Sequence, residues 1–154
     1  MPSVETLTAQ MAEAGQLDED ITTVVRTADD AWVFRFEDID VELEYSEVSG
    51  NLLVAVVIGA PPREGREAVL EALLSYSFLW RDTGGVRMAM TGKGGDVVQL
   101  FEVSADNLTP KQLVVIVSNL AANARIWRAF LASGAATEAP SPSPAQSTDF
   151  VIHV

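Results

Sequence analysis

The chain has 154 residues, 48% of them hydrophobic, which is enough for one compact domain with a single core. Its 22 acidic and 10 basic residues give a formal net charge of -12, so its surface repels nucleic-acid phosphates and anionic lipid. The absence of cysteine excludes disulfides, thiolate catalysis and cysteine-ligated zinc. No secretion signal begins the chain, and no apolar stretch reaches the roughly 20 residues of a membrane span. We therefore expect a soluble cytoplasmic protein without nucleic-acid binding or membrane insertion.

The first half of the chain predicts one helix followed by strands. Apolar residues at helical spacing predict a short helix over Val4–Ala14. Ile21–Arg26 is rich in β-branched residues and leaves open an extra edge strand. Strict alternation of apolar and polar residues predicts two half-buried strands, Trp32–Phe36 and Ile39–Tyr45, that form an antiparallel hairpin. In Leu52–Ile58 nearly every residue is apolar, so we expect a strand inside the sheet with both faces covered.

A helical pattern begins near Glu64 and carries apolar residues on two sides. One stripe consists of Leu70, Leu73, Leu74, Ser77 and Phe78. The other consists of Val69, Ala72, Tyr76 and Trp80, with Leu79 beside them. One stripe can pack on the protein's own sheet, but the second would be an exposed aromatic patch of the kind that marks an interface. We expect the stripe with Tyr76 and Trp80 to form a homodimer contact.

The second half of the chain predicts a hairpin and a long helix. Alternation over Val86–Met90 and the apolar run Val97–Val103 flank the turn Gly92–Gly95. A helix is expected from a cap at Thr109 through Ala132. The order α-βββ-α-ββ-α predicts an α+β fold, an antiparallel sheet of about five strands with three helices.

The composition of the chain changes after residue 134. Residues 135–148 are mostly Ala, Ser, Pro, Thr and Gln, which cannot bury enough apolar surface to offset the entropy of ordering. We therefore expect a domain over 1–134 and a flexible tail over 135–154. The tail closes on the apolar segment Phe150–Val154, for which docking on a sheet edge and a frayed end are both open.

No pattern in the sequence supports catalysis. Four acids, Asp38, Asp40, Glu42 and Glu44, alternate along one strand, but Leu43 stands where a calcium loop needs glycine. The glycine-rich segments Gly84–Gly85 and Gly92–Gly95 lack the spacing of a phosphate-binding loop. The single histidine, His153, lies in the tail. We expect no catalytic, cofactor-binding or metal-binding residues, no cofactor and no enzyme activity.

The order of elements in this acidic chain resembles the class I type III secretion chaperones, the family of the Tir chaperone. The resemblance is most specific from Glu64 to Ala132, where "REAVLEALLSYSFLWRDTGGVRMAMTGKGGDVVQLFEV" is similar to the family's dimer helix, Thr-Gly-Gly turn and hairpin. "RIWRAFLA" is similar to the end of the family's last helix, and "FVIHV" to short apolar tails of some members. The segment Leu17–Asp30 does not take part in the resemblance.

The resemblance implies a bacterial virulence protein of the cytoplasm, a homodimer that binds the N-terminal region of one or more secreted effectors. It would keep that region soluble and ready for export without ATP. Two other readings stay open: a chaperone-like adaptor or regulator that binds a non-effector protein, and a small enzyme.

The resemblance also assigns residues to two surfaces. The dimer interface would consist of Val69, Ala72, Tyr76, Leu79, Trp80, Val86, Met88 and Met90. The effector-binding surface would include Leu7, Met11, Val33 and Arg35.

Overall fold

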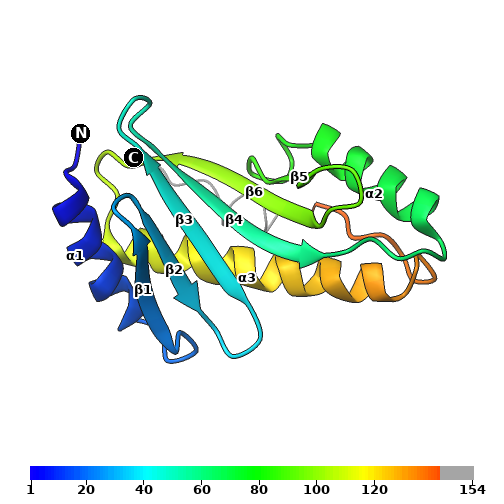
Figure 1. Cartoon of the computed structure of the whole chain (residues 1–154), viewed down its shortest axis with the longest axis horizontal. Coiled ribbons are helices and arrows are strands. Elements are labelled where there is room, and N and C mark those ends of the chain that lie inside the picture. Colours follow the sequence, from blue (N-terminus) through cyan, green and yellow to red (C-terminus); the bar gives the residue numbers. More distant parts are fainter. Residues whose placement is uncertain (143–154) are drawn as a thin grey trace.

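A six-stranded antiparallel sheet with helices behind it and at its two ends forms the domain (Figure 1). The computed structural model describes residues 1–142. The elements follow the chain as α1 (Val4–Gly15), β1 (Thr23–Ala28), β2 (Ala31–Arg35), β3 (Asp40–Ser46), β4 (Asn51–Gly59), α2 (Arg66–Phe78), β5 (Arg87–Met90), β6 (Val97–Ser104) and α3 (Pro110–Ala132). The predicted α+β architecture is confirmed. The apolar segment Phe150–Val154 lies outside the described residues.

The strands lie in the order β1-β2-β3-β4-β6-β5. The sheet has one strand more than the expected five, because the β-branched segment after residue 21 pairs with β2 as the edge strand β1. β4 lies between β3 and β6, in the interior of the sheet as predicted. β5 is a strand of only four residues at the other edge, and α2 lies beside it (Figure 1).

Local sequence signals set the helix ends. Ser3 caps α1, its hydroxyl oxygen accepting a hydrogen bond from the backbone N–H of Thr6 at 3.1 Å. Thr109 and Gln112 form a reciprocal capping box at the start of α3, with Pro110 in the first turn. Gly65 precedes α2 with a φ of +73°, and an added Cβ there would collide with the backbone of Gly134. The close approach joins the start of α2 to the end of α3.

The core lies between the sheet and the helices α1 and α3. Alternate residues of the central strands point into it, including Trp32, Phe34, Val41, Leu43, Leu52, Val54 and Val56. Trp32 also donates a hydrogen bond from its indole Nε1 to the Thr8 hydroxyl of α1 at 3.2 Å. Trp127 of α3 is fully buried and contacts Phe130 edge-to-face at 5.6 Å between ring centroids.

Two arginines of α3 fasten this helix to the sheet. Arg125 donates two hydrogen bonds to the Asp38 carboxylate, at 2.8 and 3.0 Å. Arg128 donates to the backbone carbonyls of Asp38, Val57 and Ile58. Asp38 therefore lies in the β2–β3 turn as an anchor for α3, and not on the strand face that carries the other alternating acids. The hydrogen bond from Arg125 is the main reason that the pKa of Asp38 is below its ordinary value.

Candidate binding surfaces

The outer side of α2 is an uncovered apolar surface. Leu74 and Phe78 are 70% and 83% exposed, whereas Val69, Leu73 and Tyr76 on the opposite side are buried. The prediction that this helix has more apolar surface than one subunit covers is confirmed. The assignment of the two sides was wrong, because the stripe with Val69 and Tyr76 faces the protein's own core. Helical spacing identifies two stripes but carries no information on which one meets the sheet.

A buried polar network fixes the orientation of α2. The Asn123 amide of α3 donates to the Gln99 side-chain oxygen of β6 at 2.6 Å and to the Tyr76 hydroxyl at 3.3 Å. Gln99 in turn donates to the Leu120 carbonyl at 2.9 Å, and the Tyr76 ring contacts Trp127 edge-to-face at 5.0 Å between centroids. Burial raises the pKa of the Tyr76 hydroxyl, which therefore stays neutral at physiological pH. With Tyr76 held inward, Leu74 and Phe78 must point outward.

The turn after α2 positions Trp80 at the rim of the sheet. The helix ends at Phe78, so Trp80 lies on the turn and not on a helical stripe. The buried Thr83 hydroxyl lies 3.0 Å from the Trp80 carbonyl and 2.7 Å from that of Val86, so it bridges the two ends of the turn. The guanidinium groups of Arg81 and Arg87 each lie 5.2 Å from the Trp80 ring centroid, at cation–π distance.

The remaining residues predicted for the dimer contact are divided between core and surface. Val86 and Met88 are buried in the subunit, since Met88 is on the inner face of β5 and pairs with Gln99. Ala72 and Met90 are half-buried. Leu79 and Trp80 are 40% and 41% exposed and remain available for an interface. Of the residues predicted for the dimer contact, only Leu79 and Trp80 are thus exposed in the subunit.

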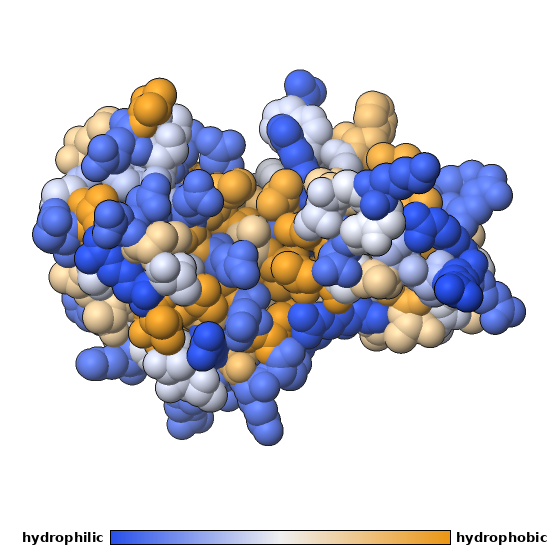
Figure 2. All heavy atoms as spheres, in the orientation of Figure 1, coloured by the Kyte–Doolittle hydropathy of each residue, from blue (hydrophilic) through white to orange (hydrophobic). Residues whose placement is uncertain are grey.

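A second uncovered apolar surface lies on the face of the sheet opposite α3. In Figure 1 this face points to the viewer, and no described helix lies in front of β3 or β4. Figure 2 shows apolar side chains gathered over the middle of this face, with hydrophilic side chains around them. The residues of this surface, here called the outer trough, are Leu53, Ala55 and Val57 of β4 with Leu100 and the largely buried Val98 of β6. The register places Ala55 beside Leu100 and Val57 beside Val98.

The outer trough shows that one expectation about β4 was wrong. We expected β4 to be covered on both faces because its residues are nearly all apolar. Leu53 and Val57 are instead 40% and 38% exposed, while Val54 and Val56 between them are buried. An apolar strand face that the subunit leaves uncovered is typical of a surface that another polypeptide covers.

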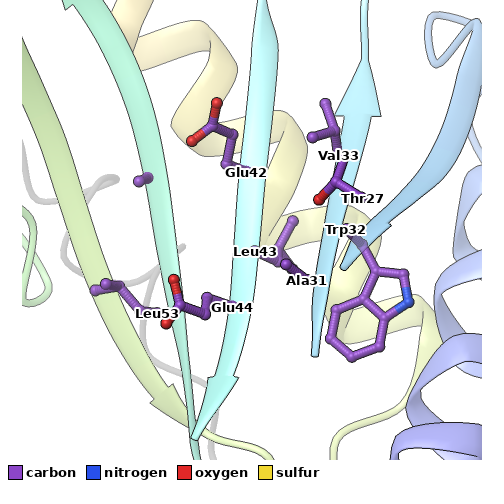
Figure 3. A pocket seen from close by; sticks show the side chains of 9 residues that line it. Thr27, Ala31, Trp32, Val33, Glu42, Leu43, Glu44 and Leu53 are labelled. Carbon is purple, nitrogen blue, oxygen red and sulfur yellow. The ribbon is translucent and has the colours of Figure 1, made fainter. Parts of the chain in front are cut away.

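Carboxylates line one side of the outer trough. Asp40, Glu42 and Glu44 alternate along β3 and point to the same face as the trough. In Figure 3 Glu42 and Glu44 extend from β3 toward β4, with Leu53 beside Glu44, whereas Trp32 points away toward α1. Asp40 faces Arg35 at 3.9 Å, and in the described part of the chain Glu42 and Glu44 have no salt-bridge partner. The predicted solvated acidic face is present, next to an apolar surface that the sequence did not reveal.

Two hollows deepen this face of the sheet. One, of about 260 Å³, lies between β2 and β4 and is lined by Val33, Glu42, Glu44 and Leu53 among others. The other, of about 420 Å³, reaches from Leu53 over Leu100 to Trp80 and Arg87. Leu53 lines both hollows, so the two lie side by side across the sheet.

The residues predicted for effector binding are also divided between the core and the outer face of the sheet. Leu7 and Met11 are fully buried beneath α1 and belong to the core, so their assignment to a binding surface was wrong. Their helical spacing marks an apolar stripe, and in α1 that stripe packs inward. Arg35 is exposed on the outer face of the sheet, opposite Asp40. Val33 points to the same face and lines a hollow there, but it is only 8% exposed. Of the four predicted residues, Arg35 alone is therefore exposed.

The described residues form neither a metal-ligand cluster nor a membrane-spanning helix. Residues 1–142 contain no group of three or more His, Cys, Asp or Glu side chains that could hold a metal ion. No described helix is both long and apolar enough to cross a bilayer. The surfaces that the fold presents are apolar and broad, which suits binding of a polypeptide.

A family model decides the relationship of this chain to known proteins. The model of the Tir chaperone protein (CesT) family matches residues 16–128, most of the chain. The chain belongs to the Tir chaperone protein (CesT) family. The predicted resemblance to type III secretion chaperones is thereby confirmed. The match also includes segment 17–30, which the sequence comparison had left out.

Solved structures of other members of this fold agree with the assignment. A chain of the ExsC–ExsE complex is 20% identical, with a TM-score of 0.65, and the alignment covers 85% of this chain and 97% of that one. A chain of the HopA1–SchA chaperone–effector complex is 13% identical, with a TM-score of 0.64, covering 80% and 93% respectively. No curated protein matches the sequence. The two structures show that this CesT family member has the fold of those chains.

Proposed function

We propose that this protein is a cytoplasmic homodimeric chaperone that binds the N-terminal segment of a secreted effector and keeps it soluble and export-competent without ATP. The observation that carries the proposal is the presence of two uncovered apolar surfaces on a member of a chaperone family. Leu74 and Phe78 on α2 form one, and the outer trough forms the other. A homodimer needs one surface and an effector needs another.

The distribution of charge supports α2 as the dimer surface. Residues 60–93, which include α2 and β5, contain five of the 10 basic residues and only four of the 22 acidic ones. The rest of the chain is strongly negative, so two copies repel each other everywhere except at this end. The dimer contact of this proposal consists of Leu74, Phe78, Leu79 and Trp80 on the side that the subunit leaves exposed.

The neighbouring structures support an effector as the client. One of them is the HopA1–SchA chaperone–effector complex. An unfolded effector segment gains affinity by wrapping a large area, and the negative charge of this chain keeps the loaded complex soluble.

Co-expression tests the proposal. The protein is produced together with the product of each neighbouring gene, and complexes are isolated and sized by light scattering. We expect two copies of this chain to carry one effector, whose N-terminal segment is protected from proteolysis. A chain that stays monomeric and protects no such segment would contradict the proposal, and capture of a folded regulatory protein alone would assign it to an adaptor.

A further inference from the structure

The outer trough is too wide and too flat for a single extended strand. From β3 to β5 the sheet spans three strand spacings, roughly 14 Å, since neighbouring strands lie about 4.8 Å apart. An α-helix with its side chains has a diameter of about 10–12 Å. The trough floor has the small Ala55 at its centre, with Leu53 and Val57 on either side along β4. An α-helix therefore fits the width of the outer trough.

The backbone chemistry of the trough also favours a helix. The floor consists of side chains on the face of a sheet, and the backbone groups of β4 there pair with β3 and β6. An extended peptide lying on this face would find no backbone partners for its own N–H and C=O groups. A helix satisfies these groups internally and presents one apolar side to the floor.

The two sides of the trough differ in charge. Glu42 and Glu44 line the β3 side, whereas Arg87 lies on the β5 side. Along an antiparallel strand, residues two apart lie about 6.8 Å from each other. Along a helix, residues four apart lie about 6 Å from each other. Cationic side chains at positions i and i+4 of a docked helix thus match the spacing of Glu42 and Glu44.

We propose that the outer trough receives an amphipathic helix of the effector segment, oriented by Lys or Arg residues at i and i+4 that pair with Glu42 and Glu44. This inference rests on the proposed function and names the chemistry of its client. Apolar contact with β4 and β6 supplies most of the affinity, and the carboxylates select which side of the helix faces β3. Effector segments without such a basic side bind more weakly.

A synthetic peptide pair tests the proposal directly. The first probe is an amphipathic peptide of about five helical turns with Leu and Ala on one side, Lys at i, i+4 and i+8 on one flank, and Gln elsewhere. The second probe has Gln in place of each Lys. Binding is measured by fluorescence anisotropy, and peptide helicity by circular dichroism. We expect the Lys peptide to become helical on binding and to bind at least about tenfold more tightly than the Gln peptide.

Matched variants separate the specific contact from the general negative charge. Glu42→Lys/Glu44→Lys changes the net charge as much as Glu13→Lys/Glu19→Lys does, and all four side chains are exposed. The first variant should lose the preference for the Lys peptide, and the second should keep most of it. Equal losses in both variants, no loss in either, or binding without gain of helicity would overturn the proposal. If an effector still co-purifies with Glu42→Lys/Glu44→Lys undiminished, this inference fails while the proposed function stands.

Discussion

Gln99 and Asn123 show how single residues decide which surface α2 exposes. They are two of the three buried polar side chains in the described part of the chain, and both take part in the network that holds Tyr76. In the sequence, Gln99 occupies a strand of apolar residues and Asn123 a helix of small apolar ones. Neither position suggests a partner until the fold brings β6, α2 and α3 together.

The substitution Gln99→Leu should destabilise the domain. It leaves the Asn123 amide and the Leu120 carbonyl without their Gln99 partner, and an unsatisfied buried polar group costs about 1–3 kcal/mol. Urea unfolding measures the change in the free energy of unfolding. The exposed Gln16→Leu serves as the control and should change it by less than about 0.5 kcal/mol. Equal stability of the two variants would show that the network contributes nothing to the fold.

The Asp38–Arg125 pair predicts a pH dependence. The pKa of Asp38 in the folded protein is below its ordinary value of 3.8, so the pair stabilises the fold above pH 3.8 and this contribution is lost as the pH falls through the lowered pKa. Melting temperatures of the wild type and Asp38→Asn, measured from pH 7 to pH 2, should therefore converge at the acid end. A difference that stays constant over this range would contradict the assignment.

At the scale of elements, β4 and α2 share one property: each has apolar residues on both sides, and the subunit covers only one. The sequence shows that both sides of these elements are apolar, but not which side is buried. Periodicity and composition carry no information on which other elements pack against each side. In β4 the inner residues pack against α3 and the outer ones form the trough. In α2 the inner residues meet α3 and the outer ones face solvent.

Adjacent residues of β4 allow a matched test of its two faces. Val56→Thr places a hydroxyl in the core at a fully buried position and should cost about 1–3 kcal/mol of unfolding free energy. Val57→Thr makes the same change at an exposed position and should cost less than about 0.5 kcal/mol. Thermal unfolding measures stability, and effector or peptide binding should weaken only for Val57→Thr when both proteins are compared in their folded state. A larger loss of stability for Val57→Thr than for Val56→Thr would contradict the assignment of Val56 to the core.

At the scale of the whole molecule, the subunit has two uncovered apolar surfaces. α2 and β5 lie at one end, where basic and acidic residues nearly balance, and the outer trough crosses the middle of the helix-free face (Figures 1 and 2). Because Trp80 and Arg87 line the second hollow and also border α2, the two surfaces meet at this rim. A dimer formed through α2 would place the trough of each copy beside the shared interface.

The substitution Phe78→Glu should dissociate the dimer. It places a charge at the most exposed apolar residue of α2, where dimerisation would remove it from water, and we expect the dissociation constant to rise at least about tenfold. Light scattering at low micromolar concentration measures the mass. Val115→Glu adds the same charge to an exposed residue near the start of α3, beside residues 16–19, and should leave the dimer intact. An unchanged mass for Phe78→Glu would rule out α2 as the interface.

The sequence alone determined the order of the elements apart from β1, the interior position of β4, the capped start of α3 and the family resemblance. These follow from local patterns, because alternation, helical spacing and capping residues act over a few neighbouring positions. The excess of apolar surface on the second helix was also visible, since composition alone reveals it.

Only the tertiary structure decided which surfaces are free. Leu7, Met11, Val69 and Tyr76 are buried while Leu53, Val57, Leu74 and Phe78 are exposed, although all eight are apolar or aromatic residues in regular elements. Their difference comes from contacts between segments far apart in the chain, such as Tyr76 with Asn123 and Trp127. The sequence pattern shows which residues share one face of a helix or strand. Whether that face is buried depends on which other elements pack against it in the folded protein.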